Sequence, residues 1–327
     1  MSVLSGDAKT GNDFGNYQKA SISGTKYEDT NADNAVTDEV GNELSGWTIK
    51  LFNSSDVEIA STTTDENGDY SFTGLTPGAT YTVCEVLETD WTQSYPTTGA
   101  DCSSLTAGTG HSVSVLSGDA KTGNDFGNYQ NVTISGYKFK DVNNNGSYDA
   151  NEPRLASWAV YLYRDDSGDG VPQAEEEIAM TTTLAEDSDP NVDTLGYYEF
   201  SDLKPGATYI VCEQVKDNWL QTAPSNNVCA GLDGIAAGGY KFANTTSGQT
   251  ETSKDFGNTP LSKIVVQFFD LTGFTNATIS CVWVVDSSET SIGETSGDPS
   301  ETQPERQLTI EDLTIGTYRC EIVITDP

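Results

Sequence analysis

DYSFTGLTPGATYTVCEV, at residues 69–86, decides the fold. Apolar and polar residues alternate on both sides of a Thr-Pro-Gly turn, which is the pattern of two half-buried strands joined by a loop. YYEFSDLKPGATYIVCEQV at 197–215 repeats the pattern, and LTIGTYRCEIV at 313–323 repeats its second half. No long window of the 327 residues has helical periodicity. The chain is therefore predicted to be all-β.

The sequence around these stretches also repeats. ISGTKYEDTNADNAVTDE (22–39) corresponds to ISGYKFKDVNNNGSYDANEP (134–153), and NDFGN (124–128) corresponds to KDFGN (254–258). Each repeat holds about seven short strands, the number typical of a sandwich of two packed sheets. We predict one sandwich at 19–130, a second at 131–259, and at 260–327 a third that lacks its last strand.

A verbatim copy marks the N-terminus. Residues 2–18 and 114–130 both read SVLSGDAKTGNDFGNYQ. The second copy ends the first sandwich, so 1–18 is predicted to be a spare last strand. Because 260–327 ends without such a strand, donation of 2–18 into the third unit of the next subunit would build a head-to-tail filament. The alternative is that the chain is a piece of a longer repeat protein.

Charge narrows the classes of partner. Fifty acidic and 16 basic residues give a net charge of −34, spread along the chain. This argues against nucleic acid and anionic membranes as partners, and it favours divalent cations. No signal peptide follows Met1 and no apolar run approaches membrane-spanning length, so we expect a mature form or a segment of a longer precursor.

The six cysteines fall into three local pairs, and none has the spacing of a zinc site. Paired cysteines in each domain favour disulfides and an extracellular location, with free buried thiols as the alternative. The predicted pairs are Cys84–Cys102, Cys212–Cys229 and Cys281–Cys320.

The combination of an Asp/Asn-rich loop after the first strand with NGDYSF…L-PG-TY…CE resembles the B-type domains of serine-aspartate-repeat surface proteins. It is also similar to the wider collagen-adhesin B-type, prealbumin-like group. The resemblance covers 19–259 well and 260–327 weakly. It implies tandem Ig-like or prealbumin-like sandwiches that act as stalk or adhesin modules, often with calcium in the acidic loops and, in some relatives, Lys–Asn isopeptide bonds.

Three acidic loops have the residue spacing of calcium sites. Positions 1, 3, 5, 9 and 12 of the loop at 141–152 carry oxygen side chains, with Gly146 at the turn. The loop at 165–176 repeats this arrangement with Gln173 in place of an acid. The loop that starts at residue 29 has Asn34 in place of glycine, and either Asp38 or Glu39 must close it. Solvated acidic turns are the alternative. The predicted ligands are Asp29, Asn31, Asp33, Asp38, Glu39, Asp141, Asn143, Asn145, Ser147, Asp149, Glu152, Asp165, Ser167, Asp169 and Glu176.

An internal crosslink is a further prediction. An isopeptide bond needs a lysine, an asparagine and a carboxylic acid buried together, because burial neutralises the amine and the acid moves protons. The spacing permits two such sets, with a Lys–Glu salt bridge as the alternative reading of each. The sets are Lys26, Asn128 and Glu85 in the first domain, and Lys138, Asn258 and Glu213 in the second.

No nucleophile–base set or phosphate loop occurs, and the chain has one histidine, so an enzyme is not expected. The predicted function is that of an extracellular structural protein, the calcium-stabilised subunit of a surface filament or pilus whose partner is another copy of itself. The alternative is a stalk or adhesin fragment that binds an unknown surface ligand. Neither reading involves membrane insertion.

Overall fold

The computed structural model describes residues 11, 13–106, 108–185, 193–267, 276–285, 288–297, 307–313 and 316–325. The regular secondary structure in these ranges consists of strands and one short 3-10 helix, η1, at Ala174–Glu176. No helix within them has the length and apolar character that crossing a membrane requires. The prediction of an all-β chain is confirmed.

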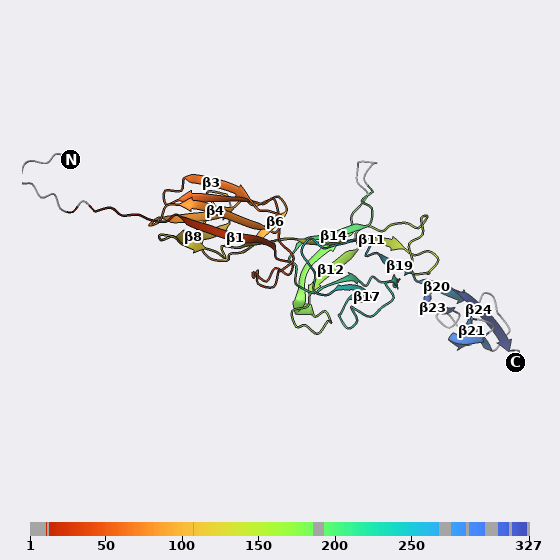
Figure 1. The fold of residues 1–327 in the computed structure, drawn as a ribbon. Coiled ribbons are helices and arrows are strands. Elements are labelled where there is room, and N and C mark those ends of the chain that lie inside the picture. Colours follow the sequence, from red (N-terminus) through yellow and green to blue (C-terminus); the bar gives the residue numbers. More distant parts are fainter. Residues whose placement is uncertain are drawn as a thin grey trace, which may run out of the picture. The chain divides into compact units, whose positions relative to one another are not determined.

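The first domain consists of two sheets (Figure 1). One has the strand order β4-β1-β10-β6, with β9 also paired to β1, and the other has the order β3-β2-β5-β8-β7. The strands are β1 Ala20–Glu28, β2 Thr48–Asn53, β3 Glu58–Thr63, β4 Asp69–Leu75, β5 Thr80–Glu85, β6 Trp91–Tyr95, β7 Ala100–Asp101, β8 Thr109–Ser114, β9 Ala120–Lys121 and β10 Phe126–Gln130.

The core of this domain follows from the alternation seen in the sequence. Along β1, buried and half-buried residues alternate from Ala20 to Lys26, so every second side chain points inward. Ile22, Leu51, Phe72 and Val83 come from four different strands and are all buried in one cluster. Phe126 of β10 is fully buried there, which stabilises the fold by about 1.5–3 kcal/mol. The last strand is thus part of the core.

The second domain repeats this architecture. Its sheets have the orders β14-β11-β19-β16, with β18 paired to β11, and β13-β12-β15-β17. The strands are β11 Val132–Lys140, β12 Ala159–Arg164, β13 Glu177–Thr182, β14 Tyr197–Leu203, β15 Tyr209–Gln214, β16 Trp219–Ala223, β17 Ile235–Phe242, β18 Thr250–Glu251 and β19 Phe256–Pro260. In both domains the last strand lies parallel to the first, in the register Lys26↔Phe126 and Lys138↔Phe256.

The third unit has fewer strands in the described ranges. β20 pairs with β23, and β22, β21 and β24 form a second small sheet in that order. These strands correspond to β1 with β4 and to β3-β2-β5, so counterparts of β6, β8 and β10 are all absent from the part of the unit that the structure describes. The strands are β20 Ser262–Gln267, β21 Asn276–Val285, β22 Ser288–Gly297, β23 Gln307–Leu313 and β24 Thr317–Thr325.

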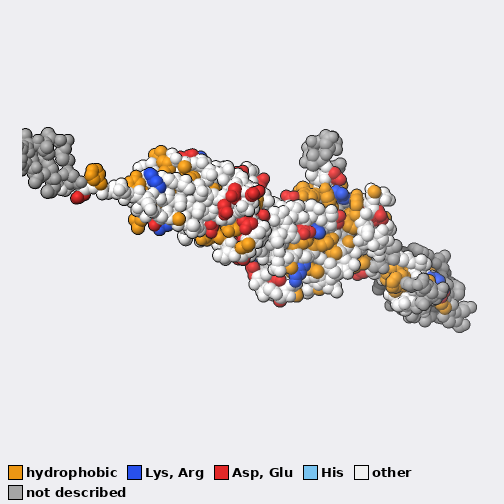
Figure 2. All heavy atoms as spheres, viewed as in Figure 1, with side chains coloured by type: hydrophobic (Ala, Val, Ile, Leu, Met, Phe, Trp, Pro, Cys, Tyr) orange, Lys and Arg blue, Asp and Glu red, His pale blue; other side chains and the backbone are white. Residues whose placement is uncertain are grey.

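The contacts divide the chain into two compact units. One contains residues 1–133, 201–207 and 244–250, and the other contains residues 134–200, 208–243 and 251–327. The predicted boundaries at 19, 131 and 260 stay a prediction; β19 extends to Pro260, which pairs with Trp219 of the second domain. Carboxylate side chains are visible on both of the first two domains, on the face shown in Figure 2.

Candidate functional site

A lysine, an asparagine and a glutamate meet in the interior of the first domain. Lys26 lies on β1, Glu85 ends β5 and Asn128 lies on β10. The Lys26 Nζ atom is 2.6 Å from Asn128 Oδ1 and 3.2 Å from Glu85 Oε2. All three residues are at most 1% exposed. The structure therefore brings together one of the two sets that the sequence predicts.

The second domain contains the same arrangement. Lys138 of β11 places its Nζ atom 2.6 Å from Asn258 Oδ1 on β19 and 3.2 Å from Glu213 Oε2 on β15. Lys138 and Glu213 are fully buried and Asn258 is 2% exposed. Both lysine–glutamate pairs lie at salt-bridge distance, as the alternative reading expects, and both pairs are buried.

Burial shifts the proton equilibria of both sets toward neutral forms. Loss of hydration lowers the pKa of Lys26 and of Lys138 to about 8, although the adjacent glutamates act in the opposite direction. Burial raises the pKa of Glu85, and it raises that of Glu213 to about 7. A neutral amine beside a protonated acid is thus accessible near neutral pH, which is the state in which an amine attacks a carboxamide.

Tryptophans complete the walls of the two sets. The Lys26 ammonium lies 4.5 Å from the centroid of the Trp47 ring, and Lys138 lies at the same distance from Trp158. Each indole packs edge-on against a second tryptophan of its domain. The rings exclude water from the amine, in addition to the core packing that the repeats indicate for them.

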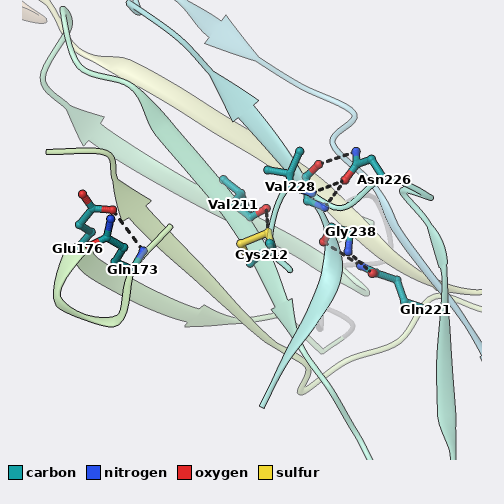
Figure 3. Close-up of a disulfide and its surroundings, with 10 residues drawn as sticks. Gln173, Glu176, Val211, Cys212, Gln221, Asn226, Val228 and Gly238 are labelled. Carbon is teal, nitrogen blue, oxygen red and sulfur yellow. Dashed lines mark hydrogen bonds between the residues drawn. A yellow bond between two sulfur atoms is a disulfide. The ribbon is translucent and has the colours of Figure 1, made fainter. Parts of the chain in front are cut away.

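Two glutamines were missed at the sequence level. The Gln93 side chain accepts from the N–H of Thr109 at 2.7 Å and donates to its carbonyl at 2.8 Å. Gln221 clamps Gly238 in the same way, at 2.7 and 3.1 Å (Figure 3). Each glutamine also acts to lower the pKa of the buried glutamate of its domain, but burial has the larger effect and the pKa of both glutamates is raised. Their matching places in DWTQSYP and NWLQTAP were the available signal.

The acidic loop at 141–152 is closed by its first and last carboxylates. Asp141 and Glu152 are buried and accept backbone N–H groups of the loop at 2.7–3.1 Å. The side-chain amides of Asn143 and Asn145 donate to Asp149 at 2.8 and 3.1 Å. Hydrogen bonds within the loop thus involve the side chains at positions 1, 3, 5, 9 and 12, and Ser147 lies exposed in the same loop.

The loop at 29–39 shows which residue takes the closing place. Glu39 is buried and accepts from the N–H of Thr30 at 2.9 Å, as Glu152 does from the corresponding residue of its loop. Asp38 is exposed and accepts a long 3.5 Å bond from the Asn31 amide. Glu39 is thus the closing carboxylate, and Asp38 takes the place of Asp149. Of the other predicted ligands, Asp29 is buried and Asp33 exposed.

The loop at 165–176 has the same framework. Asp165 accepts the N–H of Gly170 at 2.9 Å, and buried Glu176 accepts that of Ser167 at 2.9 Å. Glu176 also accepts the N–H of Gln173 at 3.2 Å (Figure 3). The Gln173 amide donates to the predicted ligand Asp169 at 3.0 Å.

All three loops turn at their sixth residue with a left-handed backbone. The φ angles are +68° at Asn34, +73° at Gly146 and +77° at Gly170. Asparagine is one of the few residues that adopt this conformation readily, so its replacement of glycine leaves the turn intact. No three His, Cys, Asp or Glu side chains in the described residues stand close enough to hold a metal ion. Calcium at these loops stays a prediction.

The three predicted cysteine pairs are disulfides. Cys84–Cys102 and Cys212–Cys229 each link residues less than 20 positions apart, and Cys281–Cys320 joins facing positions of β21 and β24. Closing the two short loops stabilises each domain by about 3 kcal/mol through the entropy of the unfolded chain. The Cys212–Cys229 bridge packs with Tyr163 and Ile210.

Comparison with known proteins identifies the first domain, since residues 20–128 match the family model described as "SdrD B-like domain". Residues 20–128 are an SdrD B-like domain. The chain is 31% identical over 182 residues to serine-aspartate repeat-containing protein F of Staphylococcus epidermidis, a match that covers 55% of this chain and 9% of that protein. It is 29% identical over 224 residues to serine-aspartate repeat-containing protein D of Staphylococcus aureus strain Newman, covering 68% and 15%.

The chain therefore spans less than a sixth of the length of these relatives. Among solved structures, the Bacillus anthracis TIE protein matches with a TM-score of 0.34 and 14% identity, over 95% of this chain and 47% of that one. The shaft pilin SpaA of Lactobacillus rhamnosus GG matches with a TM-score of 0.25 and 14% identity, over 75% and 98%. Both scores are too low to relate the arrangement of the domains.

The SdrD B-like domain and the serine-aspartate-repeat relatives identify a cell-surface, extracellular protein of structural or adhesin-stalk type. The families it matches are surface proteins and not enzymes. The predicted resemblance and location are confirmed.

Proposed function

We propose that this chain is a self-crosslinked structural segment of a cell-surface stalk or filament, whose SdrD B-like domains tie their first strand to their last by a Lys–Asn amide. The main support for this proposal is that buried Lys26 contacts both Asn128 and Glu85, and that the second domain repeats these contacts. A lysine–glutamate ion pair alone would need no asparagine beside it, and burying an isolated ion pair seldom stabilises a protein.

The chemistry balances without any added reagent. The neutral Lys26 amine attacks Cγ of Asn128, a C–N bond forms, and the carboxamide nitrogen leaves as ammonia. Glu85 in its protonated form donates to the carboxamide and takes the proton that the amine loses. The raised pKa of Glu85 and the lowered pKa of Lys26 supply the protonation states that this step requires.

We further propose that calcium stiffens the acidic loops. The donors are carboxylate, amide and carbonyl oxygens, the ligand type that calcium prefers, and the left-handed sixth residue is present in each loop. The buried carboxylates Asp141 and Glu152 hold the ends of their loop together. Calcium binding would require the asparagine amides that now donate to Asp149 to turn their oxygens inward. The net charge of −34 favours cation uptake.

Head-to-tail assembly by insertion of residues 2–18 into the third unit stays a prediction, and most of the donated segment lies outside the described residues. An adhesin stalk is the other form of the proposed function. The pairings Ser262↔Leu313 and Ile264↔Ile310 match Ala20↔Leu75 and Ile22↔Phe72. β20 and β23 of the third unit therefore correspond to β1 and β4 of the first domain.

Intact mass spectrometry of the purified chain tests the crosslink. We expect a mass below that of the disulfide-bonded sequence by two ammonia molecules, and a peptide map that links Lys26 to Asn128. Glu85→Gln should abolish the loss in the first domain alone. Glu88→Gln, a change at an exposed neighbouring glutamate, is the matched control and should retain both bonds. A folded wild-type chain with its full mass would overturn the proposal.

A further inference from the structure

The same 17-residue sequence lies in two different environments. Phe126 in the second copy is fully buried, whereas Phe14, its counterpart in the first copy, is 96% exposed. Asn128 is buried beside a lysine, whereas Asn16 is exposed. The sequence at 114–130 therefore contains β9 and the core strand β10, whereas its copy has no such packing in the described part of 2–18.

Three features of the first domain hold the second copy. Gly24 leaves room for the Asn124 carbonyl, which a Cβ at that position would strike. The Tyr70 hydroxyl donates to the same carbonyl. Lys26 reaches Asn128 two positions after Gly24 along β1. The segment thus fits a domain that has a glycine, a lysine and a tyrosine at these places.

The first copy cannot occupy this place in its own domain. The last strand runs parallel to β1, and parallel neighbours need a crossover of a dozen or more residues. Only Lys19 separates residue 18 from the start of β1 at Ala20. If residues 2–18 are used as a last strand of the first domain, they must enter a different molecule.

The third unit is a poor acceptor. By the register of β20 with β23, Val266 stands at the position of Gly24, and Leu308 stands at that of Tyr70. Neither the space for the carbonyl nor the hydroxyl that binds it is present. The second domain retains both features, since Gly136 approaches the Lys254 carbonyl and Tyr198 donates to it at 2.6 Å.

We propose that residues 2–18 act in trans as the last strand of the first domain of a second copy of this chain, and that Asn16 forms an amide with Lys26 of that copy. The step is the one proposed above, on which this inference rests: the amine attacks Cγ of Asn16, a C–N bond forms, ammonia leaves, and Glu85 transfers the protons. A copy accepts the strand only before its own 114–130 has docked.

Competition decides how often this happens. The two strands offer the same side chains, so the tethered strand is favoured by its high effective concentration. Once Asn128 has reacted, exchange is closed. In Asn128→Ala, the resident strand can dock only reversibly, whereas an incoming strand is held by the amide from Asn16. The substitution therefore favours exchange of the resident strand for the incoming one.

The test is refolding of the full chain with Asn128→Ala from denaturant at high concentration, read on reducing denaturing gels. We expect multimers that survive reduction, with peptides linking Lys26 to Asn16. They should disappear when Asn16→Ala or Lys26→Met is added. Because Asn16 is exposed, Asn16→Ala leaves the resident fold untouched.

A second arm covers the case in which Asn128→Ala does not fold. The wild-type chain is refolded with excess synthetic peptide of residues 2–18, and we expect a peptide adduct on Lys26 less one ammonia. The peptide with Asn16→Ala should give none. If the wild-type chain forms its internal Lys–Asn amides but neither peptide adducts nor multimers are found, this inference is wrong and the proposed function stands. If the wild-type chain lacks internal bonds, the crosslinking chemistry fails, and co-elution of the peptide with the refolded chain then decides whether the strand inserts.

Discussion

Lys138 and Asn258 are 120 residues apart in the chain, yet the Nζ atom of one lies 2.6 Å from Oδ1 of the other. The contact arises because the first and last strands of the domain are parallel neighbours, in the register Lys140↔Asn258. A single covalent bond at this place would close almost the whole domain into a loop.

The bond should therefore contribute strongly to stability. Asn258→Ala removes it, and by the loop-entropy argument used for disulfides a closure of this length is worth about 4–5 kcal/mol. Guanidinium unfolding should show a lower midpoint for the second domain. Asn151→Ala, at an exposed asparagine, serves as the control and should not shift it. Equal midpoints for wild type and Asn258→Ala would contradict a covalent closure.

Asn258→Ala, which cannot form the amide, should also show a minimum in its free energy of unfolding between about pH 7 and pH 8. Burial raises the pKa of Glu213 from 4.5 to about 7, so the folded chain holds an extra proton there and stability falls as pH rises through that range. Burial lowers the pKa of Lys138 from 10.5 to about 8, so stability rises again from about pH 8 to 10.5.

Urea unfolding of Asn258→Ala at a series of pH values measures this profile. Replacing both ionisable groups, by Lys138→Met together with Glu213→Met, should flatten it. A minimum that persists in the doubly substituted chain would assign the profile to other groups.

Calcium binding at 165–176 should depend on one of two adjacent glutamates. Glu176 is buried and closes the loop, whereas Glu175 beside it is exposed. We expect Glu176→Gln to weaken calcium binding at this loop at least tenfold, because the closing carboxylate is lost. Glu175→Gln should leave it unchanged. Isothermal titration and melting with calcium provide the measurement, and equal effects of both substitutions would argue for diffuse charge instead of a site.

His111 should make the first domain sensitive to acid. Its Nε2 atom is 2.7 Å from the Asp125 carbonyl, the place where Tyr240 donates to Asp255 in the second domain. Burial lowers the pKa of His111 below 6.5, so the unfolded chain binds more protons and stability is lost as pH falls through this range.

His111→Tyr should abolish this loss as the pH falls below 6.5, since tyrosine stays neutral there. Thermal melts of the first domain across these pH values check the expectation. An unchanged acid response in His111→Tyr would place its origin in the carboxylates of the loops.

Much of the fold follows from local sequence, because alternation and Pro-Gly turns fix strands wherever one face is buried. The repeats also place Lys26, Glu85 and Asn128 on three strands that any such sandwich brings together, and the cysteine pairs follow from proximity within a domain. What the sequence could not supply depends on register. Only the strand pairing shows that β10 lies parallel to β1. It also shows that Val266 of the third unit takes the position of Gly24.

The lysine, asparagine and glutamate of each site were predicted, and the glutamine beside each glutamate was missed. The repeat marks Gln93 and Gln221 as equivalent residues, but it does not show that each side-chain amide binds the backbone of another strand. The choice of Glu39 over Asp38 likewise depended on which side chain turns inward. The composition of a loop does not decide this, whereas its backbone geometry does.

The parallel pairing of β1 with β10 has a mechanical consequence. The chain enters the domain at the start of β1 and leaves it at the end of β10, and the two strands run side by side in the same direction. A pull on both ends therefore slides them lengthwise and loads all the hydrogen bonds between them at once, whereas antiparallel neighbours would open one bond at a time. With the amide formed, tension would pass from Lys26 directly to Asn128, and the residues between them would bear none of it.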